Sequence, residues 1–279
     1  MHLSEGCIHQ FLQDHKTRFA KRTMEGYETT IKQLLTFYEK PFNEISSVEI
    51  RHWLIYLGEN GLKVGTIINK VKGLRLFYYY CVEEGFIKDN PIEGVPYPKE
   101  ERKLPYYLTS EQLLRLRDLC KGNLKQRAVV EVLYSTGVRV SELTSMKLKD
   151  INWPERKIRI PMGKGEKERL VFFTKECAEH LKVYLGSRND DLPFVFLNRN
   201  GTEPFSRYSI VHWFRTFREN LDFYLTAHTL RHTFAANLAM KGMSLSCIQV
   251  LLGHTDFQTT QIYARLHQKA QKEMYDQWM

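Results

Sequence analysis

Residues 228–263 read HTLRHTFAANLAMKGMSLSCIQVLLGHTDFQTTQIY, and this stretch carries the pattern around which the chain is organised. It combines His228, Arg231, His254 and Tyr263 with a run that is otherwise apolar and helical in spacing. Polar and charged groups are costly to bury unless they are paired or used. We therefore expect a functional site built into a hydrophobic core.

The stretch predicts three consecutive helices. The first carries the histidine and the arginine three positions apart on one face and ends at Gly242. The second spans Ser244–Leu252 and ends at Gly253, so the histidine that follows lies beside exposed carbonyl groups, which favour a cation. The third begins near Thr259 and carries the tyrosine.

Composition indicates a globular chain with a basic second part. The 279 residues are 43% hydrophobic, which is enough for a sizeable core, and the length favours two domains. The formal net charge is +9: residues 1–100 hold 13 Lys and Arg against 13 Asp and Glu, whereas residues 101–279 hold 28 against 19. Such an excess permits binding to nucleic acid or to an anionic membrane surface.

Cysteine usage and the N-terminal sequence bear on the compartment. The five cysteines are scattered and none forms a C-x-x-C pair, which argues against a zinc knuckle and a disulfide framework. The N-terminus lacks a signal-peptide pattern, and the sequence has no run of 18 apolar residues. We expect a reduced, cytoplasmic protein with no membrane partner.

The first part of the chain predicts an all-helical domain, residues 1–88. Helices are expected around Ile8–Phe19, over Thr23–Tyr38, after a capping box at Ser46, and over Thr66–Glu84. Residues 89–107 contain four prolines and the charged run KEERK, so they are expected to form a linker. The second domain is then expected at residues 108–279.

A basic segment lies within the last of these helices. The segment between Asn60 and Val82 contains no acidic residue. Two interpretations fit: a solvated helix face, or a face that contacts DNA phosphates. The candidate DNA-binding residues are Lys63, Lys70, Lys72 and Arg75.

The second domain predicts a mostly helical unit with a small antiparallel β-hairpin or sheet, so the fold class is mainly α. Ile151–Met162 alternates in polarity, and LVFF at 170–173 follows the glycine-flanked turn GKGEKER, which puts Lys164 at a hairpin tip. Alone, a lysine in such a turn is simply solvated. Further helices are expected over Thr109–Lys121, Leu124–Thr136, Thr174–Leu185 and Ser206–Asn220.

Several fixed cations and a tyrosine without a metal cage favour phosphoryl transfer. Guanidinium groups stabilise charge on phosphate oxygens, and a tyrosine with a pKa near 10 becomes a nucleophile beside cations or a base. A metal site of His228, His232 and His254 is disfavoured, because no acidic ligand accompanies them. A structural role, such as a surface ion pair between Arg139 and Glu142, is open for each residue taken alone.

Four motifs carry a resemblance to a known family. LYSTGVRVSEL at 133–143, GKGEKERL at 163–170, HTLRHTFA at 228–235 and LLGHTDFQTTQIYA at 251–264 resemble those of the tyrosine recombinases, which include Xer-type recombinases and phage or transposon integrases. They occur in family order over nearly the whole second domain. The helical first part is similar in kind to the family's core-binding domain.

The resemblance implies that Arg139 and Arg231 clamp the scissile phosphate while Tyr263 attacks it. A 3′-phosphotyrosyl bond would form and a 5′-hydroxyl would leave. Because the covalent bond stores the phosphodiester energy, no cofactor is implied, and no metal.

The other site residues take supporting roles under the same resemblance. Lys164 is implied as the general acid that protonates the leaving oxygen. His228 is implied as acid or base help to the nucleophile, His254 as a hydrogen-bond donor to the phosphate, and Glu142 as an orienting residue.

The implied partner is double-stranded DNA with a specific site. A monomer when free, the protein would form a homotetramer on paired sites and exchange strands through a Holliday junction. Accessory proteins are a further candidate partner. The tail QKAQKEMYDQWM would dock on a neighbouring protomer or pack in cis. Two other functions stay open: a type IB topoisomerase-like activity and a non-catalytic DNA-binding protein.

Overall fold

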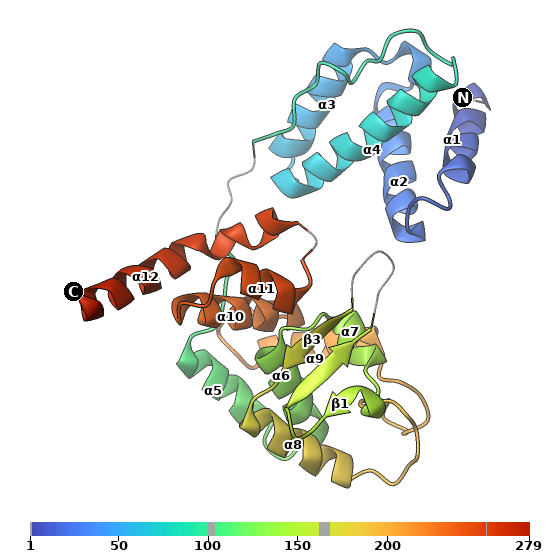
Figure 1. Ribbon diagram of the computed structural model, residues 1–279. Helices are drawn as coiled ribbons and strands as arrows, with labels where there is room; N and C mark the ends of the chain where they lie inside the picture. Colours follow the sequence, from blue (N-terminus) through green and yellow to red (C-terminus); the bar gives the residue numbers. More distant parts are fainter. Residues whose placement is uncertain (1, 100–103, 162–167, 255) are drawn as a thin grey trace. The chain divides into compact units, whose positions relative to one another are not determined.

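A computed structural model describes residues 2–99, 104–161, 168–254 and 256–279. The chain divides into two compact units, Met1–Glu101 and Arg102–Met279. Figure 1 follows the chain through both. The mainly helical fold class expected from the sequence is confirmed. Within the described ranges, no helix has the length and apolarity needed to cross a membrane.

The first unit is a bundle of helices around α4. Because its apolar residues recur at helical spacing, α4 contributes Val71, Leu74 and Phe77 to the core, all without exposed surface. The capping box expected at Ser46 is present, with Glu49 as its partner. The helices are α1 (His2–Asp14), α2 (Lys21–Tyr38), η1 (Phe42–Glu44), α3 (Ser47–Glu59) and α4 (Val64–Glu83).

The first helix differs from its expected range. A helix was expected around Ile8–Phe19, but α1 begins at His2 and ends at Asp14. Beyond it, the ring of His15 stacks on Phe19 and meets Tyr80 of α4 edge-on at 5.5 Å. These aromatic contacts tie the segment after α1 to a helix distant in sequence, and local periodicity does not reveal them.

The proline-rich segment after α4 packs on the helical unit. Ile92 and Val95 are buried in that unit's core. The Nη2 of Arg75 donates to the Val95 carbonyl at 2.7 Å, and its guanidinium lies 4.3 Å from the ring centroid of Tyr97. Leu108, by contrast, is buried in the core of the second unit.

The second unit surrounds α6, which is buried along most of its length. Its Val130, Val132 and Leu133 have no exposed surface, and α8 and α10 pack against it. The helices are α5 (Ser110–Leu119), α6 (Leu124–Thr136), α7 (Val140–Ser145), η2 (Leu148–Asp150), α8 (Lys175–Gly186), α9 (Arg207–Glu219), α10 (Ala227–Met240), α11 (Leu245–Leu252), η3 (Phe257–Thr259), η4 (Gln261–Tyr263) and α12 (Ala264–Trp278).

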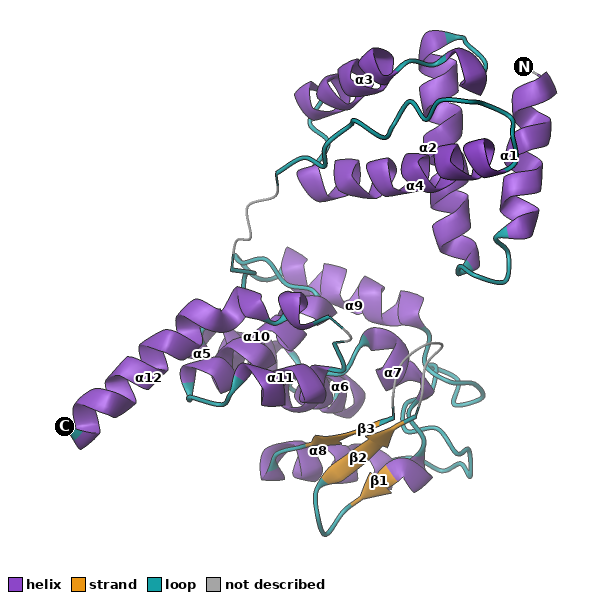
Figure 2. Cartoon of the chain, turned by 45° about the horizontal axis from the view of Figure 1, so that its top comes forward, coloured by secondary structure: helices purple, strands orange, loops and turns teal. Residues whose placement is uncertain are grey.

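A small antiparallel sheet lies among these helices (Figure 2). Its strands run in the order β1 (Ile151–Asn152), β2 (Lys157–Ile160) and β3 (Arg169–Phe172). The single strand expected over Ile151–Met162 is divided, because Pro154 cannot donate to a strand ladder and a turn forms there. The turn between β2 and β3, with Lys164, lies outside the described residues.

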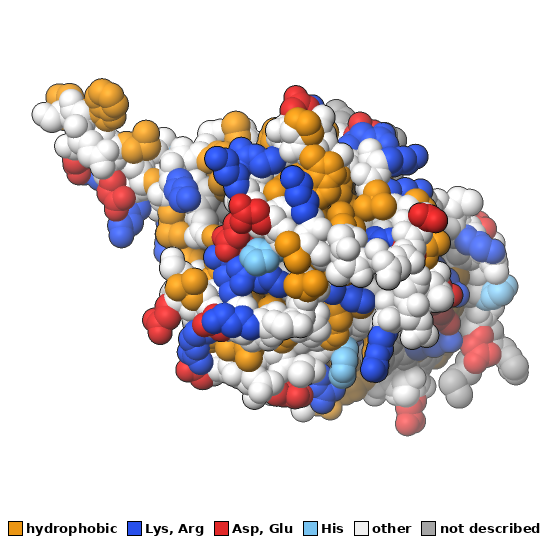
Figure 3. Space-filling model, turned by 90° about the horizontal axis from the view of Figure 1, so that it is seen from below, with side chains coloured by type: hydrophobic (Ala, Val, Ile, Leu, Met, Phe, Trp, Pro, Cys, Tyr) orange, Lys and Arg blue, Asp and Glu red, His pale blue; other side chains and the backbone are white. Residues whose placement is uncertain are grey.

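The region around Tyr263 is helical in a tighter form than expected. Two 3₁₀ turns, η3 and η4, replace the third short helix, and α12 follows directly. α12 packs on α10 through buried Ala270, whereas Met274, Tyr275 and Trp278 are exposed. Figure 3 shows apolar side chains at the projecting end of α12. The beginning of the tail therefore packs in cis, and its end is uncovered.

Gly137 ends α6 in the left-handed conformation that the sequence predicts. Its φ is 62°, and a Cβ there would lie 2.4 Å from a ring carbon of Phe234 on α10. We expect Gly137→Ala to lower the free energy of unfolding by about 2–3 kcal/mol, because backbone strain and overpacking add. Urea denaturation measures this loss.

Gly201→Ala is the matched control. Gly201 has a φ of 71° but nothing within 4 Å of its would-be Cβ, so only the backbone strain of about 1 kcal/mol should appear. Equal losses in the two variants would show that contact with Phe234 contributes nothing.

Candidate active site

Three arginines meet at the C-terminus of α11. They come from three elements: Arg139 precedes α7, Arg169 lies on β3 and Arg231 lies on α10. A helix leaves its last carbonyls without helical partners and carries partial negative charge there, so guanidinium groups are favourable caps. Three successive carbonyls each accept one such bond: Leu251 from Arg169 Nε at 2.9 Å, Leu252 from Arg231 Nη2 at 2.7 Å, and Gly253 from Arg139 Nη2 at 2.8 Å.

Arg231 also ties a second helix end to this point. Its Nη1 donates to the carbonyl of Gly137, the C-cap of α6, at 2.6 Å. The residue is 3% exposed, and burial lowers its pKa to about 10, with the charge of Arg139 acting in the same direction. The guanidinium is therefore still charged at neutral pH, and a buried cation of this kind can bind an anion.

Glu142 holds two of the three arginines in position. Its carboxylate accepts two bonds from Arg169, both at 2.8 Å, and one from Arg139 Nη1 at 3.0 Å. Burial would raise the pKa of Glu142, but the hydrogen bonds from Arg169 and from the Arg139 backbone N–H outweigh it and lower the pKa. With its side chain 11% exposed, this carboxylate is more than the surface ion pair that sequence allows.

Tyr263 is buried with its hydroxyl against a histidine. The residue is 1% exposed, and its Oη lies 2.6 Å from Nδ1 of His232 on α10. Burial raises the pKa of the phenol, while the positive charge of Arg231 opposes that rise. The nucleophile that the sequence predicts is therefore protonated at neutral pH and held by an imidazole.

Three histidines surround this hydroxyl and the arginines. The rings of His228 and His232 meet edge-on at 4.4 Å, and His254 Nδ1 lies 2.9 Å from Thr260 Oγ1. Burial and neighbouring positive charges lower the pKa of His232 and of His254 to about 4, and they also lower the pKa of His228. Neutral imidazoles at pH 7 offer one donor and one acceptor each.

A metal-binding constellation occurs elsewhere among the described residues. Glu131, Glu176 and His180 bring ligand atoms within 4.8 Å of one another. Both carboxylates, however, already bind Arg117 and Arg127 at 2.8–2.9 Å. This cluster is therefore a satisfied ion-pair network that links α5, α6 and α8.

Five of the six catalytic residues expected from the sequence converge in the second unit, and Lys164 lies outside the described residues. The sequence did not lead us to predict that Arg169 belongs to this site, or that His232 contacts Tyr263. The signal for Arg169 was its inward position on β3, in register with buried Ile160, since a buried arginine needs partners. His232 carried no comparable signal, because its partner is 31 positions away.

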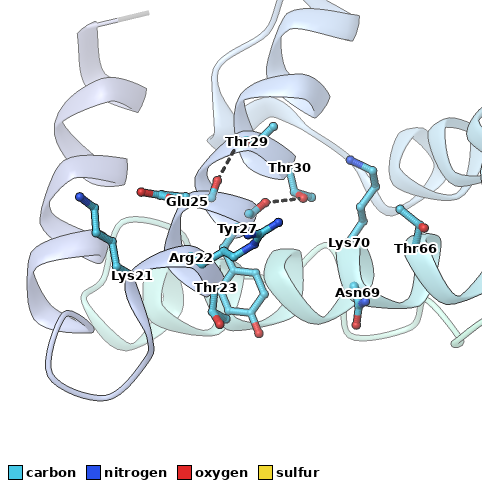
Figure 4. Close-up of a pocket in the computed structure, with 11 residues that line it drawn as sticks. Lys21, Arg22, Thr23, Glu25, Tyr27, Thr29, Thr30, Thr66, Asn69 and Lys70 are labelled. Carbon is cyan, nitrogen blue, oxygen red and sulfur yellow. Dashed lines mark hydrogen bonds between the residues drawn. The ribbon is translucent and has the colours of Figure 1, made fainter. Parts of the chain in front are cut away.

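The first unit has a groove of about 1000 Å³ between α2 and α4. Figure 4 shows Lys21 and Arg22 of α2 and Lys70 of α4 around it, with threonines and an asparagine. Lys70 also lies 5.6 Å from the ring centroid of Trp53. The other basic candidates lie elsewhere on α4: Lys72 and Arg75 line a separate hollow, and Lys63 is exposed at its N-cap.

Comparison with known proteins agrees with this geometry. Residues 106–270 match the phage integrase family, and residues 9–86 match the phage integrase N-terminal SAM-like domain. The tyrosine recombinase XerC of Thermodesulfovibrio yellowstonii is 33% identical over 92% of this chain and 90% of its own. XerD of Staphylococcus saprophyticus is 32% identical over 96% of each chain.

A solved structure shares the fold. The Tn1549 transposon integrase in complex with transposon right end DNA has a TM-score of 0.76, with 21% identity over 97% of this chain and 99% of that one. The chain therefore belongs to the phage integrase family. Within it, the chain is a Xer-like, tyrosine-type site-specific recombinase, as the four motifs predicted.

Arg169→Ala tests the arginine cluster. The change removes two hydrogen bonds to Glu142 and one cap of α11, so we expect a loss of about 2–3 kcal/mol in the free energy of unfolding at pH 7. The pKa of Glu142 is lowered from 4.5 on folding, so its stabilisation is complete above that pH and disappears as the pH falls through the folded pKa. The gap between wild type and variant should shrink in acid.

Urea denaturation from pH 3 to pH 7 measures this gap. Arg215→Ala is the control, because its pair with Glu219 is exposed and should contribute less than about 0.5 kcal/mol. A gap for Arg169→Ala that does not change between these pH values would contradict a stabilising, ionised Glu142.

Proposed function

We propose that this recombinase cuts and rejoins DNA through a 3′-phosphotyrosyl bond to Tyr263. The observation that carries the proposal is the buried hydroxyl of Tyr263, which lies within electrostatic reach of charged Arg231, and Arg231 lies beside Arg139 at the end of α11. In the reaction, Oη loses its proton and attacks the phosphorus, and the 5′-oxygen leaves as a hydroxyl after it takes a proton from the general acid. Rejoining reverses these steps and conserves the phosphodiester energy.

Arg139 and Arg231 would bind the non-bridging phosphate oxygens. A guanidinium has five N–H donors, and Arg231 commits two nitrogens to one carbonyl each, so N–H donors remain that could bind a phosphate. Because the carbonyls already hold the guanidinium in place, little reorganisation accompanies phosphate binding. Such preorganised charge is the largest source of transition-state stabilisation in many enzymes.

The remaining roles follow the family resemblance. His254 donates a hydrogen bond to the phosphate, with its Nδ1 held by Thr260, and His228 supports the reacting groups from one helical turn before His232. Glu142 orients Arg139, and Lys164 protonates the leaving 5′-oxygen. The low pKa of His254 keeps the imidazole neutral, so it acts as a dipole rather than as a cation.

We assign sequence-independent DNA contacts of the first unit to its basic side chains. Lys70 and Arg22 line the groove between α2 and α4, where threonine and asparagine side chains offer hydrogen bonds to bases. Lys63 and Lys72 are exposed and free to contact phosphates, whereas Arg75 mainly anchors the segment at Val95. Of the residues expected from the sequence, this proposal keeps Lys63, Lys70 and Lys72 as DNA contacts and gives Arg75 a mainly structural role.

Strand exchange between two sites would use a homotetramer and a Holliday junction. The exposed apolar end of α12, with Met274, Tyr275 and Trp278, supports a contact with a second protomer on DNA. We expect these helix ends to pair only when protomers assemble on DNA. The protein should therefore be a monomer when DNA is absent.

Covalent trapping tests the proposed chemistry. Wild-type protein incubated with nicked, fragmented genomic DNA should retain DNA after denaturation, because the short fragment that carries the free 5′-hydroxyl diffuses away from a nearby nick and rejoining fails. Tyr263→Phe should reduce the trapped DNA to background, since it removes one oxygen atom. Gel electrophoresis quantifies the complex, and sequencing the recovered DNA identifies the site.

Tyr275→Phe is the matched control, because Tyr275 is exposed on α12 and should not affect trapping. Undiminished trapping by Tyr263→Phe would refute the assignment of the nucleophile. Relaxation of supercoiled plasmids at no defined site would instead favour a topoisomerase.

Charge removal in the groove tests the DNA contacts. Arg22→Ala and Lys70→Ala should each weaken binding and reduce the slope of log affinity against log salt by about 1. Lys32→Ala is the control, because this residue lies on α2 outside the groove and pairs with Glu28. Fluorescence anisotropy over a salt series measures both quantities, and equal slopes in all three variants would exclude the groove.

A further inference from the structure

The hydroxyl of Tyr263 has a specific partner that the family motifs did not indicate. Oη and Nδ1 of His232 are 2.6 Å apart, and no other hydrogen bond to Oη is found within the described residues. The histidine projects from α10 one residue after Arg231, so the helix that carries the phosphate-binding guanidinium also carries this imidazole. We propose that His232 is a catalytic residue that accepts the phenolic proton of Tyr263 during attack, an inference that rests on the proposed function.

The two histidines of α10 differ in what they face. His228 is exposed and its ring meets that of His232, whereas His232 is half-buried and contacts the hydroxyl itself. One helical turn therefore separates a histidine available to the incoming DNA from one available to the nucleophile. Direct contact with the reacting oxygen favours His232 as the proton acceptor.

The step balances without another reactant. The Oη–P bond forms while the P–O5′ bond breaks, the phenolic proton moves to Nδ1, and the leaving 5′-oxygen receives its proton from the general acid, assigned to Lys164. Rejoining runs in reverse: the imidazolium returns its proton to Oη as the phenolate leaves. The same histidine thus serves both directions.

The surroundings keep His232 ready to accept a proton. Burial lowers the pKa of His232 to about 4. Electrostatic interactions with His228 and Arg231 on α10, and with His254 after α11, act in the same direction. The imidazole is therefore neutral, and its unprotonated nitrogen can face the hydroxyl. A phosphate bound between the arginines brings negative charge, which favours the imidazolium and raises this pKa when DNA binds.

The test separates proton transfer from positioning. His232→Asn places an amide near the position of Nδ1, so it can hold the hydroxyl but cannot take the proton. On a nicked duplex carrying a site recovered by trapping, we expect cleavage to slow by about 100-fold or more with DNA affinity unchanged. We expect the wild-type cleavage rate to rise with pH as His232 loses its proton, and this rise should be absent from His232→Asn. His212→Asn, an exposed histidine on α9, is the control.

Chemical rescue supplies the second measurement. Imidazole added to His232→Ala should restore cleavage about 10-fold or more, and should restore none in Tyr263→Phe. Cleavage by His232→Asn within threefold of wild type, or no rescue of a folded, DNA-binding His232→Ala, would overturn the proposal. Failure of wild type itself to trap DNA would instead refute the proposed function.

Discussion

The arginine cluster depends on one constraint: the last carbonyls of α11 have no partner within the helix. Arg169, Arg231 and Arg139 each cap one of three successive carbonyls, and each comes from a different element. Removing hydrogen-bond partners from buried carbonyls is costly, so the helix end holds the guanidinium groups where they lie. In the proposed reaction, the side chains that stabilise this helix end are also those that would bind the phosphate. Gly253 permits this geometry, because its φ is 65° and a Cβ would approach the Arg169 guanidinium to 2.8 Å.

Two features reduce the electrostatic repulsion among the positively charged groups of this arginine cluster. Glu142 neutralises part of the charge of Arg139 and Arg169 through four hydrogen bonds, including one from a backbone N–H. His232 and His254 are neutral at pH 7, because burial and nearby guanidinium charge lower their pKa values. In the proposed reaction, a phosphate would supply the missing negative charge. The arginine cluster would then act as a preorganised anion site, and His232 would become a stronger proton acceptor when DNA binds.

Local signals predicted many elements and part of the site. Gly137 and Gly253 end their helices in the left-handed conformation, and the capping boxes at Ser46 and Thr109 form as expected. These features depend on residues within four positions of one another. The end of α1, the extra strand β1 and the pairing of Arg75 with Val95 were not predicted, because they depend on packing or on a turn between short strands.

The sequence by itself determined the class of fold, the family and the residue types that can bind and attack a phosphate. Helical periodicity and motif spacing are local properties, so they can be recognised in the sequence alone. Tertiary structure alone decided that the arginines cap α11, that inward-facing Arg169 joins them, and that His232 contacts Tyr263. These contacts join residues from 21 to 114 positions apart. Packing brings them together, and no local pattern encodes which atoms meet.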